Sequence, residues 1–310
     1  MKRVLALALI GALVPQMAAA QIFEKVGTFS GQFLKIGVSA RATGMGSAFT
    51  ALADDASAAY WNPAGLVGVE GTVVSLSHTE WPADINMDYA NYTFSPTFIR
   101  GKVSLHARGL TMDPQVVRTI FRQDGTGEQF DSGDMSFGLS YARYFTDKFS
   151  AGVTVSWVHM GLADRSVNTV VSDFGLIYNI GIRGMKLGMA IQSIGGQVDF
   201  DNRSSKLPTT FKVGLAVDTY RAGPHNIIAV GEFSRPSDNK ERQNVGLEYS
   251  YNEFLFLRSG YNANFDTEGF AAGAGVGIQT SQSTSIDVDY SFVDMAALGG
   301  VHRVSLGFAF

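Results

Sequence analysis

The sequence contains no cysteine, and this absence excludes several kinds of site at once. A chain without thiols has no disulfide framework, no thiolate metal site, no cysteine nucleophile and no cysteine for a lipid anchor. Charged residues are also scarce, at 17% against roughly a quarter in soluble domains. With 24 basic and 28 acidic residues, the chain has no basic surplus, which argues against a nucleic-acid partner.

Long apolar runs are missing except at the N-terminus, and the mean hydropathy is only +0.07. Lys2 and Arg3 precede an apolar run over residues 4–14, which is too short to span a bilayer, and small residues follow at 18–20. We therefore expect residues 1–20 to be a secretory signal peptide, with a retained membrane anchor as the alternative. An exported chain without transmembrane helices crosses a membrane only as a closed barrel.

Recognisable catalytic and metal-binding motifs are also lacking. The five histidines are scattered over separate predicted strands, and no pair has the spacing of metal ligands. There is no Gly-x-Ser-x-Gly elbow, and the glycines of 273–277 lack the context and the lysine of a phosphate loop. The sequence predicts a protein without enzymatic activity, cofactor or metal. The alternative is an outer-membrane enzyme whose catalytic residues lie on neighbouring strands, far apart in sequence.

The clearest positive signal is an alternation of apolar and polar residues at the C-terminus. Val304, Leu306, Phe308 and Phe310 alternate with polar or small residues, so one face of a strand is apolar. A last strand ending in Phe308 and Phe310 is typical of bacterial outer-membrane barrels, where it pairs with the first strand. We expect it to close the barrel and to be the contact for the barrel-assembly machinery. The alternative is an edge strand of a soluble sandwich.

Strand-like runs recur through the chain after residue 70. We predict strands at 72–79, 88–95, 101–110, 133–145, 148–160, 170–181, 185–194, 208–220, 224–235, 241–251, 254–261, 267–280, 283–293 and 301–310. Short breaks alternate with longer ones, as expected for short periplasmic turns and longer outer loops. The sequence therefore predicts an all-β membrane protein, a 14-stranded antiparallel outer-membrane β-barrel over residues 71–310, surrounded by outer-membrane lipid.

The alternation also assigns a face to each side chain. The apolar set would face lipid and the other set the lumen, and aromatic residues gather near both ends of the strands as interfacial girdles. Because a lipid-facing charge is costly, charged strand residues should point inward. The predicted lumen charges are Lys212, Asp218, Glu248, Asp287, Asp289 and Arg303. They either neutralise one another structurally or line a transport path.

Residues 21–70 differ from the rest, being rich in alanine and glycine. Alanine favours helix, Asp54 or Asp55 can cap a helix over 56–61, and Pro63 prevents its continuation. We expect two short helices with a sharp bend, forming a small N-terminal helical plug.

This segment also carries a family resemblance. The run from Gly44 to Ala56, followed by Trp61 to Leu66, resembles the N-terminal hatch of FadL-like outer-membrane barrels, and more closely the PorV/PorQ family within that superfamily. The motif residues are Gly44, Met45, Gly46, Asp54, Asp55, Asn62, Pro63, Ala64 and Gly65. The resemblance implies a plug inserted into a 14-stranded barrel. An apolar pocket is possible at Met45, Phe49, Leu52, Tyr60 and Trp61, with simple packing as the alternative.

Two functions follow from the resemblance. A PorV/PorQ-like protein would support type IX protein secretion, handling secreted cargo or contacting secretion-system proteins at the cell surface. A FadL-like protein would instead pass a hydrophobic small molecule across the outer membrane, and would need an apolar lumen pocket and a gap or kink in the wall. A structural role at the surface is a third possibility. In each case we expect the outer membrane of a Gram-negative-type envelope, and we favour the PorV/PorQ-like role.

Overall fold

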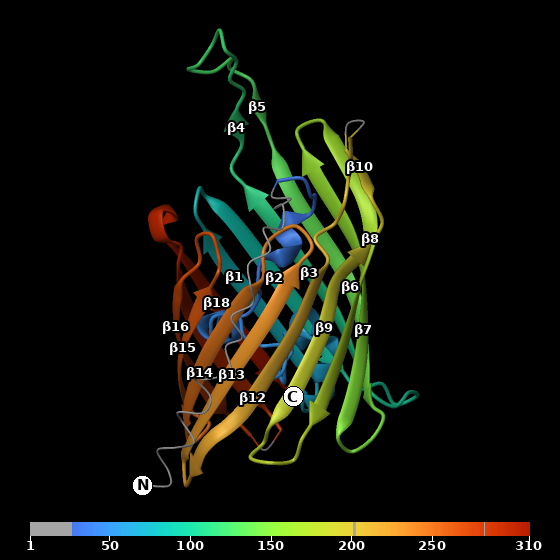
Figure 1. Cartoon of the computed structure of the whole chain (residues 1–310), viewed down its shortest axis with the longest axis vertical. Coiled ribbons are helices and arrows are strands. Elements are labelled where there is room, and N and C mark those ends of the chain that lie inside the picture. Colours follow the sequence, from blue (N-terminus) through green and yellow to red (C-terminus); the bar gives the residue numbers. More distant parts are fainter. Residues whose placement is uncertain (1–26, 201–202, 282) are drawn as a thin grey trace, which may run out of the picture.

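Fourteen long strands form one closed antiparallel barrel in the computed structural model, which describes residues 27–200, 203–281 and 283–310 (Figure 1). The barrel strands are β1 Val73–Trp81, β2 Ile85–Phe94, β3 Lys102–Met112, β6 Ser132–Tyr144, β7 Phe149–Leu162, β8 Arg165–Asn179, β9 Lys186–Gly195, β12 Thr210–Ala222, β13 His225–Pro236, β14 Arg242–Tyr251, β15 Leu255–Ala263, β16 Phe270–Gln279, β17 Ser285–Asp294 and β18 Gly300–Ala309. The predicted 14-stranded antiparallel barrel is confirmed. The predicted signal peptide, residues 1–20, lies outside the described residues.

The first and last strands close the barrel. β1 and β18 pair antiparallel from Val73 opposite Ala309 to Glu80 opposite His302. Beyond the ladder, Phe310 and Thr72 exchange two backbone hydrogen bonds of 2.9 Å. The side chains of Phe308 and Phe310 are exposed on the outside of the wall. The terminal strand therefore leaves no free sheet edge at this seam.

The two faces of the wall have opposite polarity. On β14, Val245 and Leu247 are 55% and 49% exposed, whereas Asn244 and Glu248 are each 3% exposed. Successive side chains of a strand point to opposite faces, so the exposed apolar set covers the outside and the buried polar set lines the lumen. Not every aromatic residue near a strand end belongs to an interfacial girdle: Tyr89 is 3% exposed, because it falls in the inward-facing register of β2.

The predicted alternation of short and long breaks is wrong at two places. Strand β1 continues to Trp81 and β2 begins at Ile85, because Trp81 still pairs with Ile85. Ala83 and Asp84, with φ of 66° and 56°, make the tight turn. The same end of the barrel holds a second short turn at 163–164. That end was expected to carry only longer loops.

Two long connections at this end carry small sheets that the sequence did not predict. One connection contains β4 Gln115–Val116 and β5 Gln129–Phe130, which form a hairpin projecting far beyond the barrel (Figure 1). The other contains β10 Val198–Phe200 and β11 Arg203–Ser205. A last short helix, η3 Ala296–Leu298, precedes β18. We call this the hairpin end, and the opposite end, where Phe310 lies, the turn end.

Residues 31–69 lie inside the barrel, and we call them the inner segment (blue in Figure 1). Its helical turns are η1 Gln32–Lys35, α2 Ala40–Gly44, α3 Ala58–Trp61 and η2 Pro63–Gly68. Helix α2 packs against β15 to β18, and η2 against β3 and β6 to β8. Among the described residues, no helix has the length and apolarity needed to cross a membrane. The helices are shorter than the alanine-rich run alone would favour, because the inner segment must bend to pack against the wall on both of its sides.

Candidate functional site

Asn62 links the inner segment to itself and to the wall. Its side-chain amide donates to the carbonyl oxygen of Thr50 at 2.7 Å and to that of Leu176 on β8 at 3.2 Å. Its Oδ1 accepts from the backbone nitrogen of Ala64 at 3.1 Å. Asn62 is fully buried and extended, with φ of −161°, as expected before Pro63. The side-chain amide of Asn62 therefore uses both its nitrogen and its oxygen to hold the bend before Pro63.

The rest of the motif permits close backbone contacts. A Cβ on Gly65 would lie less than 3.0 Å from the carbonyl oxygen of Ala53, so no larger residue fits there. Gly44 packs against Gly273 of β16. Gly46 has φ of 62°, a left-handed conformation that suits glycine, and Met45 is fully buried. These motif residues have clear packing roles.

Glycines on the wall form a matching surface, which we call the glycine seat: Gly152 on β7, Gly175 on β8, Gly188 on β9, Gly246 on β14 and Gly260 on β15. A Cβ on any of these five would lie less than 3.0 Å from an atom of the inner segment, at Pro63, Asn62, Thr50, Met45 or Gly46 respectively. The backbone of the inner segment thus rests directly on the backbone of the wall. Glycine at these positions permits this close approach of the two backbones.

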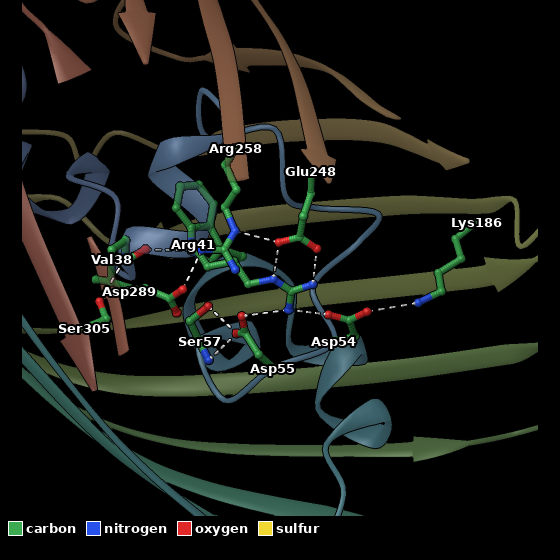
Figure 2. A network of polar contacts seen from close by, with 12 residues as sticks. Val38, Arg41, Asp54, Asp55, Ser57, Lys186, Glu248, Arg258, Asp289 and Ser305 are labelled. Atoms are coloured by element: carbon green, nitrogen blue, oxygen red, sulfur yellow. Dashed lines mark hydrogen bonds and ion pairs between the residues drawn. The ribbon is translucent and has the colours of Figure 1, made fainter. Parts of the chain in front are cut away.

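Arg41 of α2 lies at the centre of an ion-pair network beneath the inner segment (Figure 2). Its guanidinium makes two hydrogen bonds to the carboxylate of Glu248, of 2.9 and 3.0 Å. It also contacts Asp54 at 2.8 Å and Asp55 at 3.2 Å. Lys186 of β9 reaches Asp54 at 3.5 Å. The network therefore joins the inner segment to both sides of the barrel.

Arg258 extends this network along the wall. It donates to Glu248 at 2.6 Å and also to Asp289 on β17 (Figure 2). The side chains of Glu248 and Arg258 are only 3% and 2% exposed. Charges buried this deeply need partners on both sides, and Glu248 has them in Arg41 and Arg258.

A polar cavity of about 1170 Å³ lies below the network and opens at the turn end. Seven carboxylates line it, against three arginines. Asp287 is among them and makes no ion pair in the part of the chain that the structure describes. The chamber at the turn end thus has a surplus of negative charge.

The other side of the inner segment is tied to the hairpin end. Lys35 contacts the carboxylate of Asp238, in the β13–β14 turn, at 2.6 Å, and Gln32 donates to the same oxygen at 2.9 Å. Burial alone would raise the pKa of Asp238, but the hydrogen bonds from Lys35 and Gln32 outweigh it and hold the pKa below its ordinary value. Asp238 is therefore charged at neutral pH and fixes the N-terminal part of the inner segment.

Three of the predicted lumen charges have other partners than expected. Lys212 lies 3.8 Å from Glu232, a residue that the sequence analysis did not single out. Asp218 pairs with Arg221 at 2.8 Å near the turn end, just before a register shift in β12 that begins after Asp218. Arg303 is 2% exposed and donates to Thr79 at 2.8 Å rather than to a carboxylate.

The five residues of the predicted apolar pocket pack against one another, and two of them, Tyr60 and Trp61, also border a small polar cavity. Met45, Phe49, Leu52, Tyr60 and Trp61 are all less than 9% exposed and belong to one packed cluster. The Trp61 ring contacts the rings of Tyr60 and Phe49 edge-on, at centroid distances of 5.0 and 6.1 Å. Their apolar surfaces cover one another, so the packing alternative holds here.

The sequence could have revealed the missed residues only in part. Glu232 and Arg258 lie on the inward face of their strands, so the alternation that identified Glu248 also applied to them. Arg41 lies just before the resemblance motif and was not among the predicted lumen charges. In residues 27–200, 203–281 and 283–310, no group of three or more histidine, cysteine or acidic residues could hold a metal ion.

An apolar groove of about 490 Å³ runs over the outside of the wall across β18, β1, β2, β3 and β6. Its floor is formed by the small residues Ala90, Ala107 and Gly109, between the larger Leu76 and Phe137. His78 and Asp88 make a hydrogen bond of 2.7 Å at its border. The β2–β3 ladder continues beneath it without a break, so the groove does not open into the lumen.

Comparison with known proteins places the fold. A family described as an uncharacterised protein family (UPF0164) matches residues 12–101, and no curated protein matches the chain. Among solved structures, the CymD monoaromatic hydrocarbon channel has a TM-score of 0.61 and 12% identity, covering 88% of this chain and 96% of that chain. The Ralstonia pickettii toluene transporter TbuX has a TM-score of 0.60 and 15% identity, and the match covers 88% of this chain and 97% of that chain. A Pseudomonas aeruginosa FadL homologue has a TM-score of 0.53 and 11% identity, and the match covers 89% of this chain and 98% of that chain. The chain has the fold of the FadL-like outer-membrane barrels.

Proposed function

We propose that this chain is an outer-membrane channel of the FadL-like type that passes small hydrophobic molecules, with the inner segment as its plug. The observation that carries this proposal is the inner segment seated within a closed 14-stranded barrel, in a fold shared with CymD and TbuX. The names of those two proteins give monoaromatic hydrocarbons and toluene as what they pass. The proposal includes no catalytic step, cofactor or metal.

The outer-membrane location rests on the apolar exterior of the wall. Side chains such as Phe137, Phe174 and Leu247 are half exposed over its outside, which suits acyl chains rather than water. We propose that the signal peptide directs export and that the barrel-assembly machinery recognises β18, with Phe308 and Phe310. These steps follow from the sequence pattern.

Passage through this barrel requires the inner segment to move. At rest, the apolar side chains of Phe49, Trp61 and Leu66 are covered, and the remaining lumen is polar. Movement of the segment would uncover apolar surface that a hydrophobic molecule can contact.

An engineered disulfide tests this proposal, because the natural chain has no cysteine to interfere. Thr43 of α2 and Ser291 of β17 have side-chain oxygens 2.8 Å apart, a separation suited to a disulfide after substitution to Thr43→Cys and Ser291→Cys. Uptake of labelled toluene by cells producing this variant should stop under oxidising conditions and return after reduction. The matched control is Thr93→Cys with Ser104→Cys, a pair 2.9 Å apart whose disulfide joins β2 to β3 within the wall and leaves the inner segment unlinked. Equal uptake by the locked variant and the control would contradict the proposal.

A second candidate is the PorV/PorQ-like role in type IX secretion, and one observation favours it. The hairpin that carries β4 and β5 ends in Ile120 and Phe121, whose side chains are 83% and 90% exposed. Exposed apolar side chains on a projection are suited to a protein partner. Replacing residues 117–128 by a short turn should abolish capture of secreted cargo while toluene uptake is unchanged. Unchanged cargo capture would remove this candidate.

A further inference from the structure

A second, much smaller cavity lies between the inner segment and the wall toward the hairpin end. It has a volume of about 70 Å³, enough for roughly five to seven water-sized atoms. Trp61 of the inner segment and Gln192, Lys212, Glu232 and Arg242 of the wall line it. Phe265 and Glu268, in the β15–β16 loop, complete the lining, so the cavity faces the hairpin end. A long acyl chain does not fit there.

Lys212 lines this cavity and is held only loosely, by one long ion pair with Glu232 and by the Trp61 ring. The residue is 9% exposed, and its ammonium lies 4.7 Å from the centroid of the Trp61 ring. The nearest carboxylate oxygen, Oε1 of Glu232, is 3.8 Å away, beyond hydrogen-bond distance. The other oxygen, Oε2, accepts from the backbone nitrogens of Phe49 and Thr50 at 3.0 and 2.9 Å. A buried ammonium in this position needs further acceptors.

Arg242 presents a second unsatisfied cation to the same cavity. Its Nε is buried and has no acceptor within the described residues. Its guanidinium lies over the Phe265 ring, 4.4 Å from the centroid. Two carboxylates, Glu232 and Glu268, line the cavity against three cations, Lys35, Lys212 and Arg242, so the acids compensate the cations incompletely. A buried polar group left without a partner calls for an explanation, and a ligand supplies one.

We propose that this cavity binds a small oxyanion, a short-chain carboxylate or inorganic phosphate, between Lys212 and Arg242. An oxyanion supplies the acceptors that both cations lack, and arginine is suited to carboxylate and phosphate oxygens. The Trp61 ring gives an apolar floor for a short carbon body. Because the ligand would touch the wall and the inner segment at once, its binding stabilises the seated segment by mass action.

Isothermal titration calorimetry on the full chain purified in detergent tests the proposal. Sodium acetate and sodium phosphate are titrated separately against the protein in sodium chloride of constant ionic strength. We expect saturable binding of at least one of the two, and which one binds distinguishes a carboxylate from a phosphate site. Lys212→Gln and Arg242→Gln should each weaken it at least tenfold. Lys240→Gln removes an exposed cation at the same end and should leave the affinity unchanged.

A second variant keeps the test meaningful if loss of a buried charge disturbs folding. Ser234 lines the cavity and is 6% exposed, so Ser234→Leu fills the space while both cations remain. This variant should lose binding and keep its thermal unfolding temperature without ligand. Equal binding by Ser234→Leu and the natural chain would overturn the proposal, as would the absence of saturable heat from both anions. The site does not depend on the proposed channel function, since binding is measured without any flux.

Discussion

Glu248 is the residue on which the charge network depends. Its carboxylate is shared by Arg41 of the inner segment and Arg258 of the wall, and all three are drawn together in Figure 2. An isolated buried ion would be unstable, but a carboxylate held by two guanidinium groups has its oxygens satisfied. The side chain of Glu248 thus holds the inner segment, which we propose to move, against the wall of the barrel.

Removing this carboxylate should be costly. Glu248→Ala leaves Arg41 and Arg258 without their shared partner, and breaking a buried pair in this way costs about 3–5 kcal/mol. Chemical unfolding of the purified barrel in detergent would measure the change. Glu128→Ala, which removes an exposed carboxylate from the hairpin, should change the free energy of unfolding by less than about 0.5 kcal/mol. Equal effects of the two substitutions would mean that Glu248 is not a structural link.

The glycine seat makes a second prediction at the same scale. Gly175→Ala places a Cβ against Asn62, so the inner segment must shift, at a cost of about 1–3 kcal/mol for overpacking. Limited proteolysis should then cleave the inner segment faster than in the natural chain. Gly231→Ala is the control, since a Cβ there would meet no atom within 4 Å. Faster cleavage in both variants, or in neither, would show that the seat does not position the segment.

At the scale of elements, the strands followed from the sequence and much of the inner segment did not. The alternation of apolar and polar residues predicted all fourteen barrel strands, because each strand meets lipid on one face and a polar lumen on the other. It also placed Glu248 and Asp289 inward. Which charges pair depends on register and on the inner segment, and these are set by packing across the barrel. Asp218 shows this, since it pairs with Arg221 of its own strand and not with another predicted lumen charge.

The site was harder to predict than the wall for the same reason. Asn62 and Gly65 were recognised as a motif, but their contacts with Leu176 and Ala53 join residues that are unrelated in the local pattern. The small cavity depends on Lys212 and Arg242, from strands that are not neighbours. Local periodicity gives the face of a residue but not the residue opposite it across the lumen.

The link between η1 and the β13–β14 turn predicts a pH dependence. The pKa of Asp238 is lowered in the folded protein, so its stabilisation is complete above the unfolded value of about 3.9 and is lost as pH falls through the folded pKa. Asp238→Asn should therefore reduce the free energy of unfolding by about 1–3 kcal/mol at pH 6. The difference in the free energy of unfolding between Asp238→Asn and the natural chain should shrink as the pH falls below the pKa of the unfolded state. A difference that does not vary with pH would show that the charge of Asp238 has no part in the contact.

At the scale of the whole molecule, the inner segment divides the lumen into two unlike chambers. The larger chamber, at the turn end, carries a surplus of carboxylates, whereas the small cavity toward the hairpin end has more cations than carboxylates in its lining. The inner segment between them is seated on glycines, tied by Arg41 and Asp238, and packed around Trp61. Polar, backbone and apolar contacts with the wall hold it at many points without a covalent link.

The measurement that tests this account most directly is the conductance of single barrels in a planar bilayer, with and without residues 36–66. If the inner segment closes the lumen, the natural chain should conduct little, and the deletion variant should assemble and pass small ions with a large, steady conductance. The deletion variant should first be shown to form a barrel by its β-sheet circular dichroism. An assembled deletion variant with the conductance of the natural chain would contradict the central claim that the inner segment is the plug.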